Sequence, residues 1–347
     1  MFNLDEMPLR LARFLAFAEP GAGDVEVLSY TPMSGGYSRL LARADVAWTL
    51  QGQRVTESFV LRGDPRPENA PFETDRAAEW DVLRSIAEFV ATAAARYIDI
   101  DGSWLDTPAI VLEHSSARSL LPILGEGADP MPLVPALAAA AASFHTIPLD
   151  RLPRGLPRPT SYDDYLDDRI DEWRRAAADH VEPIPVMNYV AGWLHANRPP
   201  PVPLSLTHGD FQTSNLMLDD TGAIVVLDWE MAQIGDPRED LGYFQAVARA
   251  AGPDLIGLDP LGFCARYREL TGFDESQVNP EVLTYFLVLG VIGIVRRVLE
   301  GGSRYARGTN RLLIPAFLLG TISFAAASWP PVCDTSVAPP EPTPTLP

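Results

Sequence analysis

One stretch, from residue 206 to residue 243, constrains this chain more than any other, because its acidic side chains flank two short apolar runs. The runs 216–218 and 224–227 carry the bulky and β-branched residues that favour strands, and the Asp-Asp-Thr-Gly segment between them is typical of a tight turn. Antiparallel pairing would set Asn215, before the first strand, close to Asp228, after the second. We therefore predict a hairpin whose open end gathers polar side chains.

These side chains predict a site for a metal ion and a phosphate. Asn215 and Asp228 offer an amide oxygen and a carboxylate, which suit a hard cation such as magnesium. Asp210 lies five residues before Asn215 and provides a carboxylate that is free to meet a substrate. The stretch thus combines two candidate metal ligands with one candidate catalytic group.

With 347 residues, the chain is long enough for two domains or lobes, and 47% hydrophobic with 21% charged residues is typical of a soluble globular protein. Its 46 acidic residues outnumber the 27 basic ones, which gives a formal charge of −19. That charge disfavours nucleic acid and anionic membranes as partners and is compatible with cationic ligands. Solubility explains the same acidity more simply, and the oligomeric state is left open.

The basic residues are all arginines, because the chain contains no lysine. This absence excludes a Walker-type phosphate loop and Schiff-base chemistry, both of which need a lysine. The two cysteines, Cys264 and Cys333, are too few for a zinc site or a disulfide framework, and a reducing compartment suits them. The N-terminal segment shows no secretory cleavage pattern, so a cytoplasmic location is expected.

Two apolar stretches have to be weighed as membrane spans. The stretch 282–295 is too short and ends in two arginines, and the stretch 312–329 is interrupted by a proline and by hydroxyl side chains. Both are predicted as buried helices of a large lobe, and no membrane association is expected.

The N-terminal part predicts strands joined by a glycine turn over 34–38. Such a turn is commonly a plain hairpin, and a phosphate-binding loop is the alternative. Arg62 ends a later strand and Glu79 lies on the next helix, where each alone would be a surface residue, but in one small lobe the two can pair. The polar segment 113–116 follows a buried strand, and its backbone could bind a purine. The expected elements are helices over 4–18 and 74–90 and strands over 25–30, 40–50, 58–62 and 109–112.

The rest of the chain predicts mainly helices. The helix 161–175 carries five aspartates, which usually form a solvated face; a lip that attracts a cationic acceptor is the alternative. The last residues, 330–347, are rich in proline and lack periodicity, so they are expected to be disordered. The other expected helices are 133–144, 241–250, 260–270, 280–299 and 311–329.

The motifs His-Gly-Asp at 208–210, Asn215 and Asp-Trp-Glu at 228–230 resemble, in order and spacing, the catalytic and metal-binding segments of the protein-kinase-like superfamily. The glycine of the first motif and the Trp-Glu of the last resemble a narrower group, the aminoglycoside phosphotransferase family with its choline-kinase-like and acyl-CoA-dehydrogenase-linked relatives. Gly-Asp-Pro at 235–237 with Asp240 matches that family's continuation. The resemblance extends, more weakly, over most of the chain.

This resemblance implies an α+β, bilobal protein-kinase-like fold with a small lobe of β-sheet and helix and a larger, mainly helical lobe. The implied division is a nucleotide-binding lobe over 1–112, a hinge over 113–116, a catalytic and acceptor-binding lobe over 117–329, and the tail 330–347. The implied activity is that of an ATP-dependent O-phosphotransferase, which moves the γ-phosphoryl group to a hydroxyl of a small molecule or acyl thioester. ATP or GTP and Mg²⁺ are the implied cofactors.

By the same resemblance, Asp210 orients the acceptor hydroxyl and takes its proton, because phosphoryl transfer needs positioning and charge neutralisation more than covalent chemistry. Asn215 and Asp228 hold magnesium against the nucleotide phosphates. Arg62 meets the phosphates and pairs with Glu79. The remaining implied roles are backbone cover of the phosphates at Ser34, Gly35, Gly36, Tyr37 and Ser38, backbone contact with the purine at Glu113, His114 and Ser115, and bracing of the site by His208, Asp236 and Asp240.

Two positions depart from the family pattern. Arg62 stands where most kinase-like enzymes have a lysine, and it carries the same charge on a wider, planar head; the acyl-CoA-dehydrogenase-linked branch also tends to have Val-Leu-Arg here. Ser38 precedes Arg39, where that branch usually has Ser-Asn. Because of Arg62, a catalytically silent protein that binds a nucleotide or a partner is the alternative function. A metal-dependent hydrolase fits poorly, because no histidine cluster accompanies the acids.

Overall fold

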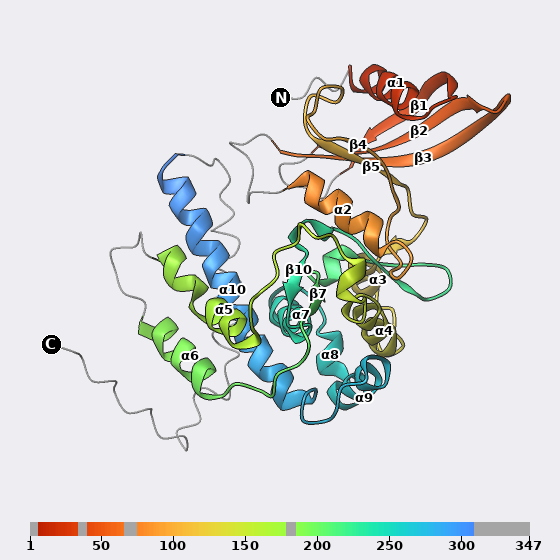
Figure 1. Cartoon of the computed structure of the whole chain (residues 1–347). Coiled ribbons are helices and arrows are strands. Elements are labelled where there is room, and N and C mark those ends of the chain that lie inside the picture. Colours follow the sequence, from red (N-terminus) through yellow and green to blue (C-terminus); the bar gives the residue numbers. More distant parts are fainter. Residues whose placement is uncertain (1–5, 34–39, 66–74, 178–184, 309–347) are drawn as a thin grey trace.

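The computed structural model describes residues 6–33, 40–65, 75–177 and 185–308. They form two lobes, a small one of sheet and helix and a larger one made mainly of helices (Figure 1). The predicted glycine turn at Ser34–Ser38, the predicted helix 311–329 and the proline-rich tail 330–347 lie outside the described residues.

The small lobe is a five-stranded antiparallel sheet between two helices. Its elements are α1 (Met7–Ala18), β1 (Gly23–Pro32), β2 (Leu40–Leu50), β3 (Gln53–Gly63), α2 (Arg76–Ile86), β4 (Ala95–Asp99) and β5 (Ala109–Glu113). The strand order is β1-β2-β3-β5-β4, with α1 and α2 on opposite sides (Figure 1). Successive side chains of β5 lie on opposite faces of the sheet. Val111 packs in the core under α1, and its neighbour Ile110 packs in the core shared with α2. This pairing also sets Arg62 of β3 opposite Ile110.

Several elements of the small lobe differ from the expectation, among them β3, which begins at Gln53 and not at residue 58. Helix α2 is shorter than the predicted 74–90; it begins where the Asp75 side chain accepts hydrogen bonds from two backbone N–H groups and ends at Ile86. Strand β4 was not predicted, because the alanine-rich run before it lacks strand character. Pairing with β5 decides its conformation, which is a tertiary effect that overrides local propensity.

The larger lobe surrounds two short sheets with helices. Its helices are α3 (Leu120–Gly125), α4 (Leu133–His145), α5 (Tyr162–Ala177), α6 (Pro185–Ala196), α7 (Arg238–Ala251), α8 (Leu255–Leu258), α9 (Pro260–Thr271) and α10 (Pro280–Ala306). Its strands are β6 (Arg118–Ser119), β7 (Ser205–Thr207), β8 (Leu216–Leu218), β9 (Ile224–Val226) and β10 (Gln233–Gly235). One apolar core runs from α2 through β8 and β9 to α4 and α9, and a second lies among α5, α6 and α10. The two lobes therefore share a core beneath the sheet.

The predicted hairpin is confirmed, because β8 and β9 pair antiparallel. In its turn the Asp219 N–H donates to the Ala223 carbonyl oxygen at 3.0 Å. At its open end the Leu227 N–H donates to the Asn215 carbonyl oxygen at 2.9 Å. This bond sets Asn215 beside the residue that precedes Asp228, as the strand pairing requires.

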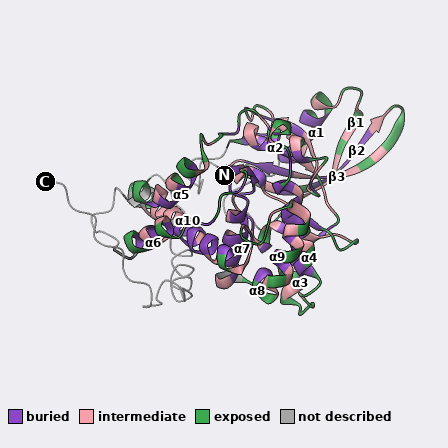
Figure 2. Ribbon diagram, turned by 60° about the horizontal axis from the view of Figure 1, so that its bottom comes forward, coloured by how far each residue is buried: buried purple, intermediate pink, exposed green. Residues whose placement is uncertain are grey.

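Helix α10 has the length and apolar composition of a membrane span, and it alone among the described helices does. It has 27 residues, so the expectation that the apolar stretch 282–295 is too short was wrong. Most of its apolar segment is buried against α7, α5 and α6 (Figure 2). Packing inside the lobe accounts for the apolar composition, as predicted for a core helix.

Candidate active site

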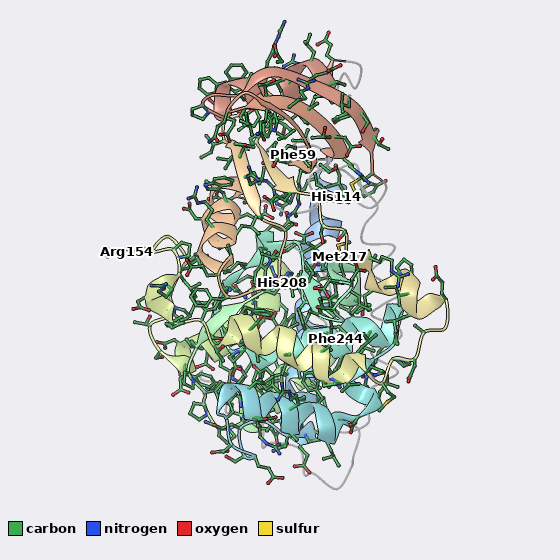
Figure 3. The ribbon with its side chains drawn as sticks, turned by 90° about the vertical axis from the view of Figure 1, so that its right-hand side faces the viewer. Phe59, His114, Arg154, His208, Met217 and Phe244 are labelled. Atoms are coloured by element: carbon green, nitrogen blue, oxygen red, sulfur yellow. The ribbon has the colours of Figure 1, made fainter. Side chains whose placement is uncertain are left out.

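A cleft of about 350 Å³ lies between the small lobe and the hairpin. Its apolar lining includes Leu41 and Val60 from the sheet and Met217 and Leu227 from the hairpin. His114 and Met217 lie on facing sides of it (Figure 3). A concave, mostly apolar space with a few polar groups suits a planar ligand such as a purine.

The backbone at 113–115 lines this cleft, but part of its hydrogen-bonding capacity is already committed. The Glu113 N–H donates to the Ala94 carbonyl oxygen and the His114 N–H to the Ser58 carbonyl oxygen, both at 2.9 Å. No acceptor for the Ser115 N–H is found in the part of the chain that the structure describes. The predicted purine contact is therefore narrowed to carbonyl oxygens and the Ser115 N–H. Burial lowers the pKa of His114, which favours a neutral ring in the cleft.

Arg62 lies at the inner end of the cleft, where it is brought together with Glu79. Its guanidinium also contacts the Asp228 carboxylate and lies 3.2 Å from Glu230 Oε2. Arg62 is 8% exposed and Glu79 is 2% exposed. Burial by itself would lower the pKa of Arg62, but the three neighbouring carboxylates raise it. The side chain is thus held as a cation between the lobes.

A second arginine, which was not predicted from the sequence, completes this cluster. Arg76 contacts Glu79, donates from Nε to Asp64 Oδ1 at 3.0 Å, and lies 3.9 Å from Glu230 Oε2. With Arg62, the cluster contains two guanidinium groups and four carboxylates, those of Asp64, Glu79, Asp228 and Glu230. The excess of negative charge favours a further cation. The three-residue spacing of Arg76 and Glu79 on a helix was the signal that could have shown this pair.

Hydrogen bonds to Asp240 and to the hairpin hold the loop that carries His208, Gly209 and Asp210. Gly209 has φ +76°, and a Cβ there would lie 2.3 Å from the Met231 carbonyl oxygen, so glycine is required. The buried Asp240 carboxylate accepts from the His208 N–H at 2.7 Å and from the Gly209 N–H at 2.9 Å. The His208 ring is hydrogen-bonded through Nε2 to the carbonyl oxygen of Leu227, at 2.8 Å. Loop and hairpin are thereby joined.

The buried His145 contacts Asp240, whereas Asp236 contacts α5 and the start of α7. His145 Nε2 lies 3.1 Å from Asp240 Oδ2, and its Nδ1 lies 2.7 Å from Tyr267 Oη. Asp236 accepts from Tyr162 Oη at 2.8 Å and from the backbone at the start of α7. Asp236 therefore ties α5 to α7, and among the described contacts it does not reach the loop directly.

Both oxygens of the Asp210 carboxylate accept hydrogen bonds. Tyr243 Oη donates to Oδ1 at 2.7 Å, while Gln212 Nε2 and Asn215 Nδ2 donate to Oδ2, each at 2.9 Å. Arg297 Nη1 lies 3.3 Å from Oδ1. Tyr243 and Arg297 were not predicted as site residues, because no spacing rule relates a loop to helices so far along the chain.

Asn215 and Asp228 fit a hard cation. The Asn215 amide nitrogen donates to the backbone oxygen and to Oδ2 of Asp210, both at 2.9 Å, and its Oδ1 receives no hydrogen bond from the described residues. Asp228 has φ +71°, a left-handed conformation that is uncommon in residues with a Cβ and concentrates at functional sites. No group of three or more His, Cys, Asp or Glu that could hold a metal is found among the described residues. A cation here would need further oxygens from phosphate or water.

The sequence model of a phosphotransferase enzyme family matches residues 41–273, which include the Arg62 cluster, the loop and the hairpin. The chain belongs to this phosphotransferase family. Acyl-CoA dehydrogenase family member 11 of Gallus gallus is 30% identical over 249 residues. That match covers 67% of this chain and 30% of the relative, so the chain spans less than a third of the relative's length.

Two solved structures of this fold are similar to the chain over nearly its whole length. The GDP complex of aminoglycoside 2′-phosphotransferase-IIIa has a TM-score of 0.63 at 14% identity, covering 92% of this chain and 99% of that one. A choline kinase from Streptococcus pneumoniae has a TM-score of 0.57 at 14% identity, covering 88% and 95%. The predicted family and the bilobal, kinase-like α+β fold are both confirmed.

Proposed function

We propose that this protein transfers the γ-phosphoryl group of ATP to a hydroxyl of a small molecule or acyl thioester. The observation that carries the proposal is the position of Asn215, which contacts Asp210 on one side and lines the cleft with Asp228 and Arg62 on the other. A group facing the acceptor and groups facing the phosphates are thus adjacent, as in-line transfer requires.

The side chains divide the work between acceptor and nucleotide. Asp210 orients the acceptor hydroxyl and takes its proton as the phosphoryl group arrives. Arg62, kept cationic by its carboxylate neighbours, binds the nucleotide phosphates. Asn215 and Asp228 would hold Mg²⁺, which when bound neutralises charge on the phosphates. Ser34, Gly35, Gly36, Tyr37 and Ser38, proposed to cover the phosphates, lie outside the described residues.

A cationic acceptor was suggested by the five aspartates of α5, and two of them have arginine partners on the same helix. Asp168 pairs with Arg175 and Asp171 with Arg174, each at 2.7 Å, which partly neutralises this acidic face. An acyl thioester is the alternative acceptor, because the curated relative is named for its acyl-CoA dehydrogenase family. For the nucleotide, ATP is proposed and GTP is the alternative, because the aminoglycoside phosphotransferase cited above binds GDP.

One observation favours a second candidate, a silent nucleotide-binding protein. The Arg62 guanidinium contacts Asp228, so an internal cation already neutralises the carboxylate that the metal would use. In a silent protein this ion pair would persist when nucleotide binds.

The two candidates separate in one assay of phosphoryl transfer from labelled ATP with magnesium to a panel of hydroxyl acceptors, sugars, hydroxy acids and hydroxyacyl thioesters among them. We expect transfer to at least one class and a loss of about 100-fold or more in Asp210→Asn, which removes the proton acceptor. A magnesium-dependent thermal shift with ATP but no transfer to any acceptor would support the silent protein. If neither ATP nor GTP shifts the melting temperature, both candidates fail, because a ligand that binds the native state stabilises it.

A further inference from the structure

Arg297 reaches from α10 to the loop that carries Asp210. Its Nη2 donates to the Gly209 carbonyl oxygen at 2.7 Å, its Nη1 donates to Tyr243 Oη at 2.9 Å, and Nη1 also lies 3.3 Å from Asp210 Oδ1. The guanidinium carbon lies 5.0 Å from the centre of the Tyr243 ring. A planar guanidinium with several directed contacts has little freedom to turn, so it fixes the groups that it touches.

Tyr243 transmits this contact to the carboxylate. Burial raises the pKa of Tyr243, so its hydroxyl keeps its hydrogen at neutral pH. Because Oη accepts the hydrogen bond from Arg297, its single hydrogen is left to donate to Asp210 Oδ1 at 2.7 Å. The direction of the chain of hydrogen bonds is therefore determined, from Arg297 through Tyr243 to Asp210.

Close packing of two helices sets Arg297 over Tyr243. A Cβ added to Gly242 of α7 would lie 2.1 Å from the backbone of Phe286, and one added to Gly290 of α10 would lie 3.1 Å from the Tyr243 Cα. Only glycines allow α7 and α10 to approach this closely. Arg297 follows Gly290 by seven residues, which is two helical turns, and so lies on the same face of α10.

We propose that Arg297 and Tyr243 are a positioning pair that aims the Asp210 carboxylate at the acceptor hydroxyl. The loop itself holds Oδ2 through Gln212 and Asn215, and the pair holds Oδ1 from two other helices. Without the pair, Oδ1 would lose its fixed position and could swing about Oδ2, which keeps its hydrogen bonds from Gln212 and Asn215. The proposal rests on the proposed function, in which Asp210 meets the acceptor hydroxyl. The contacts of Arg297 and Tyr243 with Asp210 do not depend on that function.

The test compares Arg297→Gln, Arg297→Lys and Tyr243→Phe with a matched control on the same helix. Arg296 is the next residue, and its side chain is 15% exposed against 13% for Arg297. Its Nη1 lies 3.0 Å from Glu300 Oε1 and 3.3 Å from Glu172 Oε1, and it has no described contact with Asp210. Arg296→Gln therefore removes a half-buried arginine from α10 without touching the pair.

In the phosphoryl-transfer assay, Arg297→Gln should lower kcat about 10- to 100-fold, because a carboxylate that is slightly misplaced loses that much of its effect. KM for ATP should change less than about twofold, because the pair does not face the nucleotide cleft. Arg297→Lys should recover part of the loss, Tyr243→Phe should lower kcat as well, and Arg296→Gln should stay within about twofold of wild type. An Arg297→Gln enzyme with wild-type kcat, or an equal loss in Arg296→Gln, would overturn the proposal.

A double-mutant cycle separates positioning from general support of the fold. In the Asp210→Asn background, Arg297→Gln should cause no further loss of the residual rate, because the group that it positions is gone. An equal loss in both backgrounds would show a merely structural role and overturn the pair.

If no acceptor is ever phosphorylated, the proposed function fails. The contact between Arg297 and Asp210 can then still be tested with the four proteins of the cycle, which are wild type, Asp210→Asn, Arg297→Gln and the double variant. Their urea unfolding midpoints should shift non-additively if Arg297 and Asp210 interact. Strictly additive shifts would refute the pair independently of catalysis, so the two failures can be told apart.

Discussion

Replacing Arg62 by alanine should weaken the fold and nucleotide binding together, because one guanidinium neutralises buried carboxylates and also lines the cleft. Glu79, its partner, is 2% exposed and cannot recover its lost interaction from water. Removing one member of a buried ion pair typically costs about 3–5 kcal/mol. Glu79 keeps its contact with Arg76, so the cost for Arg62→Ala should lie near the lower end, at about 3 kcal/mol.

Two further variants turn this estimate into a sharp test. Arg62→Lys keeps a charge but lacks the fork that meets Glu79 and Asp228 at once, and losing one charged hydrogen bond should cost about 2 kcal/mol. Arg54 is a matched control in the same sheet: it pairs with Glu26 at 2.8 Å, but the two side chains are 44% and 64% exposed. Arg54→Ala should therefore cost less than about 1 kcal/mol.

The measurements are urea unfolding at pH 7 and melting with and without magnesium and ATP. At a ligand concentration about 100 times Kd, wild-type protein should gain about 2.7 kcal/mol, and Arg62→Ala should lose most of that gain. If Arg62→Ala unfolds within about 1 kcal/mol of wild type, the cluster does not stabilise the fold as the burial implies. If it keeps the full gain from nucleotide, Arg62 does not bind the phosphates.

Two other predictions concern a glycine and a cysteine. Gly209→Ala should cost at least about 2 kcal/mol more than Gly222→Ala, because both glycines have positive φ but only a Cβ at Gly209 meets the Met231 backbone; equal unfolding midpoints would contradict the clash. Burial raises the pKa of Cys264 to about 11 from 9.0, so the unfolded chain loses its thiol proton first and the unfolding free energy should fall as pH rises from about 9 to 11. Cys264→Ala should make that fall smaller, and buried tyrosines with raised pKa values, such as Tyr243 and Tyr267, account for the part that remains. Urea unfolding at pH 8, 9.5 and 11 measures the fall; a slope unchanged in Cys264→Ala would count against the buried neutral thiol.

Several features of the candidate site could be predicted from the sequence because they depend on neighbours along the chain. The turn at Asp219 and the short apolar run on each side of it determine the hairpin, and the hairpin alone sets Asn215 next to Asp228. The positive φ of Gly209 is also local to its loop, whereas the clash of a Cβ with Met231 depends on the tertiary structure. The family resemblance then added the role expected of each of these groups.

Other features required contacts that no local pattern encodes. Strand β4 exists because β5 pairs with it, and Asp167 of α5 pairs with Arg198, which lies 31 residues further along the chain. His145 lies 95 residues from Asp240, which it holds, so no pattern within either segment could bring the two side chains into contact.

The sequence by itself therefore determined which chemical groups the loop and hairpin offer, Asp210, Asn215 and Asp228, because spacing and turn chemistry act over a few residues. Only the tertiary structure decided how those groups are held. Arg62 meets Asp228 across 166 residues, and Arg297 reaches Asp210 across 87. Such pairs depend on how sheet and helices pack, and packing is a property of the whole core that is not contained in any one segment.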